Sequence, residues 1–352
     1  MSHTSDRPHS ASLRRPRIAI NGLGRIGRGL LRSAAEDPNC PFDIVAANDL
    51  ADVGVLAWLT KRDTVHGGAK VPVHADGDAI VAGRHRVVLS SITDPTALPW
   101  LALGVDVVIE STGRFRTRTQ AAAHLKAGAR KVVISAPGES KDPPDATVVM
   151  GINHGVLRPE HTVISAASCT TTCLAPVAQA VHAAFGIVNG TMTTVHAYTA
   201  DQALVDTAHK KEWRRGRSAA QNIVPTSTGA ASAIGLVLPE LQGRLHGIAL
   251  RVPVPDVSLV DLVVQVERAA TIQSVNDALR AAAAAATPGT LRIEDEPLVS
   301  SDLIGDVHGS IVDSALTHVQ GERLVKVVAW YDNEGGYASR LYALVQHYAA
   351  LA

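Results

Sequence analysis

The chain has 352 residues, too many for one ordinary hydrophobic core, so its length favours two domains. Lys plus Arg and Asp plus Glu number 33 each, and the resulting zero net charge argues against nucleic acid or an acidic surface as the main partner. Three cysteines are too few for a disulfide framework, and no apolar stretch is long enough to predict a membrane span. We therefore expect a cytoplasmic protein.

The first ordered elements follow residues 1–16, which we expect to form a disordered tail. Their short basic, Ser-bearing composition also resembles an organelle transit peptide weakly, and that alternative stays open. A strand is expected at 17–21, followed by a Gly-rich turn and a helix to about residue 36. A second strand is expected at 43–49.

The turn between these elements has the spacing of a dinucleotide-binding fingerprint. Gly22, Gly24 and Gly27 form the pattern G-x-G-x-x-G, and Asp49 follows Gly27 by 49 − 27 = 22 positions. Glycines let backbone N–H groups approach a pyrophosphate at a helix N-terminus, and an acidic residue at this distance accepts hydrogen bonds from ribose. A Gly-rich structural turn is the alternative, but the flanking strands and the spaced acid favour a nucleotide site.

The remaining elements divide the chain in two. Near-continuous apolar strands at 105–110, 131–135 and 162–165, with a helix at 118–127, favour a parallel sheet covered on both faces. Later strands alternate, at 190–196, 247–252, 258–267 and 324–330, with helices at 230–241 and 272–286. We expect an α/β Rossmann-type dinucleotide-binding domain over 17–168 and a mixed α+β catalytic domain over 169–333, with a last helix at 334–352 returning to the first domain.

A thiol and an imidazole are the candidate reactive groups. Cys169 lies where a helix begins, and His196 lies in a strand, 196 − 169 = 27 positions later, which fits a helix, a turn and a returning strand. A helix N-terminus and a neighbouring imidazole both favour the thiolate. The alternative is a buried cysteine and a hydrogen-bonded histidine with structural roles only.

Six separate motifs resemble those of the phosphorylating glyceraldehyde-3-phosphate dehydrogenase family, in the family's order, across nearly all of residues 17–352. They are Asn21-Gly22-Leu23-Gly24-Arg25-Ile26-Gly27-Arg28, Ser168-Cys169-Thr170-Thr171, Thr194-Val195-His196-Ala197-Tyr198-Thr199, Thr226-Ser227-Thr228-Gly229-Ala230-Ala231, Arg251-Val252-Pro253 and Trp330-Tyr331-Asp332-Asn333-Glu334.

The resemblance implies roles for individual residues. Cys169 is the nucleophile, and His196 raises its reactivity and takes the proton as hydride leaves. The substrate's own phosphate binds at Thr199, Asp201 and Arg251, whereas inorganic phosphate binds at Ser168, Thr170, Arg215, Thr228 and Gly229. Cofactor contacts fall at Arg25, Ile26 and Asp49, in addition to the fingerprint glycines, with Ser135 and Asn333 towards the nicotinamide. No metal site is expected.

The implied reaction oxidises glyceraldehyde 3-phosphate through a Cys169 thioester, which inorganic phosphate cleaves to 1,3-bisphosphoglycerate. An Arg fork with Thr hydroxyls suits such phosphate groups. The cluster Arg214, Arg215 and Arg217 has the alternative of being an ordinary solvated group of charges, but the zero net charge and the neighbouring Thr228-Gly229 favour anion binding.

Three positions depart from the family pattern. Thr172 replaces an Asn, which removes or replaces a hydrogen bond that orders the loop. Gly335 replaces a Trp, so we expect a looser cofactor or domain contact. Thr207-Ala208 stands where NAD-specific relatives carry bulkier residues and leaves room for NADP, although the Asp49 carboxylate repels a 2′-phosphate and favours NAD.

Other functions remain open at this point. Erythrose-4-phosphate dehydrogenase is the first alternative, although Thr199 favours the triose phosphate. An arsenate-using paralogue is a second, and a non-catalytic scaffold that kept the fold is a third. Direction of flux and regulation stay undetermined. In the family the segment matching 199–221 reaches a neighbouring subunit, so the resemblance implies a homotetramer.

Overall fold

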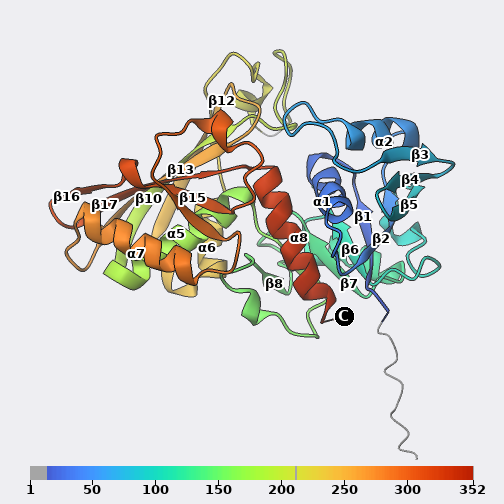
Figure 1. Ribbon diagram of the computed structural model, residues 1–352, viewed down its shortest axis with the longest axis horizontal. Helices are drawn as coiled ribbons and strands as arrows, with labels where there is room; N and C mark the ends of the chain where they lie inside the picture. The colour runs from blue at the N-terminus through green and yellow to red at the C-terminus, as the bar shows by residue number, and fades with distance from the viewer. Residues whose placement is uncertain (1–13, 211, 352) are drawn as a thin grey trace, which may run out of the picture.

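The computed structural model describes residues 14–210 and 212–351 and contains two β-sheets, each with its own hydrophobic core (Figure 1). Residues 1–13 of the predicted tail lie outside the described residues. Arg14 is described, and its guanidinium donates to Asp106 at 2.8 and 2.9 Å. No helix of the described ranges is long and apolar enough to cross a bilayer.

The first sheet has nine strands in the order β3-β4-β5-β2-β1-β6-β7-β9-β8. From β5 to β8 all neighbours are parallel, and β3 and β4 add an antiparallel edge that the sequence prediction did not include. Every residue of β6 and β7 is buried, as expected for a sheet covered on both faces. The strands are β1 (Arg17–Asn21), β2 (Asp43–Asn48), β3 (Val73–Asp76), β4 (Ala79–Ala82), β5 (His85–Ser90), β6 (Val107–Glu110), β7 (Lys131–Ile134), β8 (Ala146–Thr147) and β9 (Val163–Ser165).

The last helix belongs to the core of the first sheet. Its side chains Tyr337, Leu341, Leu344 and Tyr348 are buried in the same cluster as Leu30 of α1, and Figure 1 shows α8 beside α1. The predicted helix at 118–127 is divided into two short helices. The helices of this half are α1 (Arg25–Glu36), α2 (Val53–Lys61), α3 (Arg118–Ala121), α4 (Ala123–Lys126) and α8 (Gly335–Ala349).

The second sheet is mixed. Its main path is β11-β12-β10-β13-β17-β15-β14, with β16 paired to β17; β10–β12 and β14–β15 are parallel, and the other pairs are antiparallel. The strands are β10 (Ile187–Ala197), β11 (Val224–Ser227), β12 (Leu245–Val252), β13 (Ser258–Val266), β14 (Leu291–Glu294), β15 (Ser310–Asp313), β16 (His318–Gln320) and β17 (Leu324–Tyr331).

Three helices cover the second sheet: α5 (Cys169–Phe185), α6 (Ala230–Val237) and α7 (Ile272–Ala285). The predicted helix at 230–241 ends at Val237, because Pro239 lacks a backbone N–H and disfavours helical geometry in the residue before it. Helix α5 is buried along most of its length. Its first residue, Cys169, packs against both hydrophobic cores, so this helix begins where the two halves meet.

Candidate active site

The N-terminus of α5 presents Cys169. Ser168 caps the helix, because its Oγ accepts a hydrogen bond from the backbone N–H of Thr171 at 3.1 Å. The preceding residue, Ala167, has φ of 57°, a left-handed conformation that costs a non-glycine residue about 1–3 kcal/mol and that recurs at functional sites. The cap and this sharp bend place the thiol at the positive end of the helix dipole.

His196, near the end of β10, faces the thiol. Its Nε2 lies 3.5 Å from Cys169 Sγ, so the predicted thiol and imidazole are brought together. Its Nδ1 lies 2.7 Å from the carbonyl oxygen of Ala197 and 3.0 Å from Arg251 Nη1, and these two contacts call for opposite tautomers. In the tautomer with the proton on Nδ1, the shorter bond to Ala197 forms and the Nε2 lone pair is free to accept the thiol proton.

Burial opposes the formation of charge on this pair. It raises the pKa of Cys169, an effect that the positive charge of Arg251 and hydrogen bonds at the helix start reduce. Burial, together with Arg251, lowers the pKa of His196 to about 3. Both shifts favour a neutral thiol beside a neutral imidazole, whereas the sequence argument led us to expect a thiolate.

Tyr331 contacts His196 and the hydroxyl of Thr170, next to Cys169, a role that the sequence analysis did not assign. Its ring packs edge-on against His196, with centroids 5.9 Å apart. Its buried hydroxyl bonds the hydroxyls of Thr170 at 2.9 Å and Thr194 at 2.8 Å. The Thr170 hydroxyl, which the resemblance assigns to inorganic phosphate, is therefore engaged with Tyr331. The only sequence signal for Tyr331 was its place in the C-terminal motif.

Arg251 carries a positive charge that the surrounding protein does not neutralise directly. Its Nη1 donates to Thr199 Oγ1 at 3.0 Å and to the Ala197 carbonyl at 3.2 Å. Its buried Nε has no hydrogen-bond partner within residues 14–210 and 212–351, and burial lowers the pKa of the guanidinium. An unpaired buried cation next to the thiol suits an anionic ligand.

Asp201 links the two predicted phosphate subsites. Its carboxylate accepts from the Thr199 hydroxyl and forms an ion pair with Arg215. Arg215 is also held by Glu212 at 2.6 Å. Only 13% of its side chain is exposed, compared with 63% for Arg217, which pairs with Asp206. The structure therefore separates the arginine cluster: Arg215 faces the site, and Arg217 belongs to a solvated surface pair.

Thr228 and Gly229 precede α6. The Thr228 hydroxyl accepts from the backbone N–H of Ala230 at 3.2 Å, and Gly229 is the residue from which the helix starts. Arg215 Nη2 lies 3.5 Å from the carbonyl oxygen of Ser227, directly before them. Arg215 therefore lies close to Thr228 and Gly229, although it precedes them by more than ten residues in the chain.

Gly22 and Gly24 of the fingerprint border a cavity of about 340 Å³ at the carboxyl ends of the parallel strands, where dinucleotides bind in open α/β sheets. Gly22 has φ of +94°, and a Cβ there would lie 2.9 Å from the backbone nitrogen of Thr112. A Cβ on Gly27 would lie 2.1 Å from the carbonyl oxygen of Gly22. Asp49 also lines the cavity and accepts from the backbone N–H of Leu23 at 2.8 Å.

The other cofactor candidates have defined partners. The Arg25 guanidinium forms ion pairs with Glu334 and Asp63. Arg25 and Ile26 are the first residues of α1, so their backbone N–H groups are the atoms available for a cofactor contact. The backbone N–H of Ser135 donates to the carbonyl of Glu110 at 2.9 Å. The amide oxygen of Asn333 accepts from the Ser258 hydroxyl at 2.6 Å, which fixes the orientation of the amide.

Two of the three departures from the family pattern, Thr172 and Gly335, have defined surroundings. Thr172 is buried, and a Cβ on Gly309 would lie 3.0 Å from its methyl group. A Cβ on Gly335 would lie 2.9 Å from Asp332 Oδ2 and 3.1 Å from His66 Nε2. The space next to the Gly335 backbone is therefore occupied by His66 and Asp332.

Comparison with known proteins agrees with this geometry. Residues 16–118 match the family model described as the glyceraldehyde 3-phosphate dehydrogenase NAD binding domain, and residues 168–333 match that of the C-terminal domain. The chain is similar to "Glyceraldehyde-3-phosphate dehydrogenase" of Geobacillus stearothermophilus, with 49% identity over 95% of this chain and 98% of the relative.

Two further relatives match over slightly less of the chain. "Glyceraldehyde-3-phosphate dehydrogenase 1" of Streptomyces avermitilis is 52% identical, and "Glyceraldehyde-3-phosphate dehydrogenase, plasmid" of Cupriavidus necator is 51% identical. In both cases the match covers 92% of this chain and 96% of the relative. The chain, with its dinucleotide cavity and its adjacent thiol and imidazole, belongs to the glyceraldehyde-3-phosphate dehydrogenase family.

Proposed function

We propose that this protein oxidises D-glyceraldehyde 3-phosphate with NAD and inorganic phosphate to 1,3-bisphosphoglycerate, through a thioester on Cys169. The observation that carries the proposal is the 3.5 Å separation of Cys169 Sγ and His196 Nε2, beside an Arg251 without a direct counter-charge. A nucleophile with an oriented base and a neighbouring anion site is what acyl transfer to phosphate needs.

The charge states of the pair suggest the order of proton movements. His196 Nε2 accepts the Cys169 proton as sulfur bonds to the aldehyde carbon, and backbone N–H groups at the start of α5 face the developing oxyanion. The imidazolium then returns this proton to the oxyanion, which gives a hemithioacetal hydroxyl. NAD, when bound, supplies the chemistry of hydride acceptance. His196 takes the hydroxyl proton as the thioester forms. A phosphate oxygen then bonds to the acyl carbon, the carbon–sulfur bond breaks, and the sulfur regains a proton from the His196 imidazolium.

The anion contacts support two phosphate positions. Thr199, Asp201 and Arg251 serve the substrate's phosphate, and Arg215, Thr228 and Gly229, with Ser168 and Thr170, serve inorganic phosphate. Engagement of the Thr170 hydroxyl by Tyr331 favours an indirect contribution from Thr170, through the position of the α5 N-terminus. In the subsite for the substrate's phosphate, the negative charge of Asp201 partly offsets the positive charges of Arg251 and Arg215.

The residues present fit a dinucleotide. The cavity, the close backbone approach at Gly22 and the Asp49 carboxylate match the requirements of pyrophosphate and an unmodified ribose. A preference for NAD over NADP follows from the negative charge of Asp49. Saturation kinetics with both coenzymes test this preference, and a kcat/KM that is higher with NADP would contradict it.

Replacing Cys169 with Ser tests the proposal most directly. We expect NAD reduction with glyceraldehyde 3-phosphate to fall at least 1,000-fold, because a serine hydroxyl is a far weaker nucleophile at neutral pH. NAD binding, measured by fluorescence quenching, should be retained. The matched control is Cys173→Ala, which removes the buried second thiol of the same helix. Turnover retained in Cys169→Ser would reject the proposal.

The same assay separates the alternatives. Phosphate dependence of NAD reduction distinguishes phosphorolysis from hydrolysis, and arsenate in place of phosphate tests the arsenate-using paralogue. A higher kcat/KM with erythrose 4-phosphate would favour the longer sugar phosphate.

The domain division, the quaternary structure and the location complete the proposal. The two hydrophobic cores support domains over 17–168, completed by 334–352, and over 169–333. Exposed apolar side chains at Leu204 and Trp213 support a homotetramer in which the segment 199–221 meets a neighbouring subunit. We propose a cytoplasmic location.

A further inference from the structure

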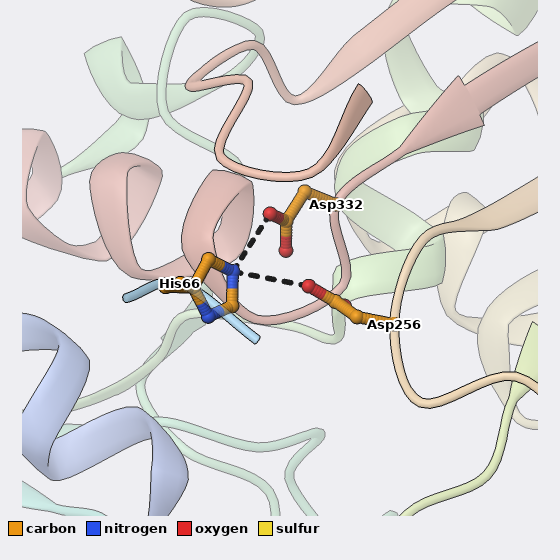
Figure 2. A group of neighbouring side chains, drawn as sticks. All are labelled: His66, Asp256 and Asp332. Carbon is orange, nitrogen blue, oxygen red and sulfur yellow. Dashed lines mark hydrogen bonds and ion pairs between the residues drawn. The ribbon is translucent and has the colours of Figure 1, made fainter. Parts of the chain in front are cut away.

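His66, Asp256 and Asp332 form a cluster outside the reacting site. His66 follows α2 in the first half of the molecule, Asp256 lies between β12 and β13, and Asp332 lies between β17 and α8. Figure 2 shows the imidazole pointing at both carboxylates. Its Nε2 lies 2.9 Å from Asp332 Oδ2 and 3.0 Å from Asp256 Oδ2, and both aspartate side chains are fully buried.

Hydrogen bonding does not account for Asp256. Asp332 is well satisfied, because its oxygens accept from the backbone N–H groups of Gly305 at 2.8 Å, Glu334 at 2.9 Å and Gly335 at 2.6 Å, as well as from His66. Within residues 14–210 and 212–351, Asp256 has only the His66 ion pair at 3.0 Å, and neither of its oxygens accepts a hydrogen bond of good geometry. A buried carboxylate with one shared partner is costly, which indicates a missing compensating group.

The charges of the cluster also indicate a missing positive group. An imidazolium at His66 neutralises one of the two buried carboxylates and leaves the other. The ring's second nitrogen, Nδ1, lies 3.6 Å from Asp63, whose own counter-charge is Arg25.

We propose that His66, Asp256 and Asp332 bind a divalent first-row cation, such as Mn²⁺ or Zn²⁺. The three ligand atoms all lie within 4.8 Å of one another. The nitrogen–oxygen separations of 2.9 and 3.0 Å are those of adjacent ligands on a cation with bonds of about 2.0–2.2 Å. One imidazole and two carboxylates form a mixed donor set that suits these ions.

The surroundings of the cluster fit this assignment. Asp63 faces Nδ1 of His66, in the position of a carboxylate that orients a ligating imidazole. His66 and Gly335 also line a cavity of about 340 Å³ between α1 and α8, which provides an entry path and room for water ligands. Because His66 belongs to the dinucleotide-binding half and both aspartates to the other, the cation links the two halves.

A titration of the full chain with Mn²⁺, followed by loss of the free-ion EPR signal, tests the proposal. Mn²⁺ is the first probe because it prefers oxygen and nitrogen ligands, so the Cys169 thiol does not compete. We expect one saturable site per chain, and we expect Asp256→Asn, which preserves the side-chain shape, to weaken binding at least tenfold. Asp295→Asn, which removes an exposed carboxylate paired with Arg280, is the control and should change the affinity less than twofold.

Thermal unfolding provides a second readout. Mn²⁺ should raise the Tm of the wild type and of Asp295→Asn but not that of Asp256→Asn. His66→Gln removes the nitrogen ligand and repeats the test if Asp256→Asn does not fold. Absence of saturable Mn²⁺ and Zn²⁺ binding to the wild type would overturn the proposal and leave the ion pairs with His66 as the account of the cluster. Undiminished binding in the folded variants would also overturn it.

Discussion

At Cys169, two physical effects act in opposite directions. The helix N-terminus and Arg251 stabilise a thiolate, whereas burial of the sulfur favours the neutral thiol, and the latter effect is the larger. His196 is likewise kept neutral, because burial and Arg251 both disfavour an imidazolium. In the proposed mechanism the imidazole is therefore a general base during attack, in the tautomer whose Nδ1–H donates to the Ala197 carbonyl.

The pH dependence of alkylation tests this charge state. A raised Cys169 pKa leaves a small thiolate fraction at neutral pH, and a His196 pKa of about 3 leaves the imidazole neutral from about pH 5 upward. We expect the rate of iodoacetamide alkylation of the cofactor-free enzyme to keep rising from about pH 7 to about pH 9. A rate that reaches a plateau below about pH 7 would indicate a thiolate–imidazolium pair instead.

Tyr331 is a positioning residue. We expect Tyr331→Phe to destabilise the protein by about 1–3 kcal/mol, because the buried hydroxyls of Thr170 and Thr194 lose a partner. We also expect a lower kcat with little change in KM, because Thr170 follows the nucleophile in the helix. Denaturant unfolding and steady-state kinetics measure the two effects. Tyr342→Phe, which removes a hydroxyl bonded to Asp37, should lower stability without changing kcat.

At the scale of elements, the ends of helices carry most of the chemistry. Helix α5 begins at Cys169, α1 begins directly after Gly24 of the dinucleotide fingerprint, and α6 begins directly after Gly229. Each start offers unpaired backbone N–H groups and a positive dipole end, which suit a developing oxyanion, a pyrophosphate and a phosphate, respectively. Helix α8 differs, because a carboxylate of the chain itself, Asp332, accepts the N–H groups of its first turn.

The start of α8 gives a prediction in which packing overrides helix propensity. Alanine in place of glycine usually stabilises a helix by about 1 kcal/mol. Gly335→Ala should instead lower the Tm, because the added Cβ would lie 2.9 Å from Asp332 Oδ2 and 3.1 Å from His66 Nε2. Gly155→Ala, at a position with nothing within 4 Å of the new Cβ, is the control. An unchanged or higher Tm in Gly335→Ala would mean that His66 and Asp332 move aside easily.

At the scale of the molecule, α8 and the cluster at His66 hold the two sheets together. Helix α8 follows the second sheet but contributes its apolar side chains to the core of the first (Figure 1). Arg25, at the start of α1, pairs with Glu334 directly before α8. The two halves are therefore connected by an apolar helix face and by charged groups near its N-terminus.

The exposed apolar surface predicts the assembly. Leu204, Val205 and Trp213 are 77%, 70% and 90% exposed, which is unusual for large apolar side chains in a monomer. We expect light scattering of the wild type to give a tetramer, and Leu204→Asp with Trp213→Asp to give smaller species, because a buried charge disfavours the contact. Leu101→Asp, at an equally exposed leucine of the other half, is the control. A stable, active wild-type monomer would contradict the prediction.

The sequence by itself determined the local structure and the family. Its hydrophobic periodicity predicted the parallel sheet and the mixed sheet, and the spacing of Gly22, Gly24 and Gly27 predicted the turn before α1, because these features depend on neighbours in the chain. It also singled out Cys169 and His196. It missed β5 and the short edge strands β3 and β4, because brief elements give weak periodic signals. It also placed the end of α6 beyond Pro239.

Only the tertiary structure decided what surrounds each charge. The raised pKa of Cys169, the contact of Tyr331 with Thr170, and the separation of Arg215 from Arg217 all depend on burial and on partners far away in the chain. The same holds for His66, Asp256 and Asp332, which come together only because α8 and two loops meet. Burial sets the energetic cost of a charge, and a linear sequence does not specify which groups share a buried space.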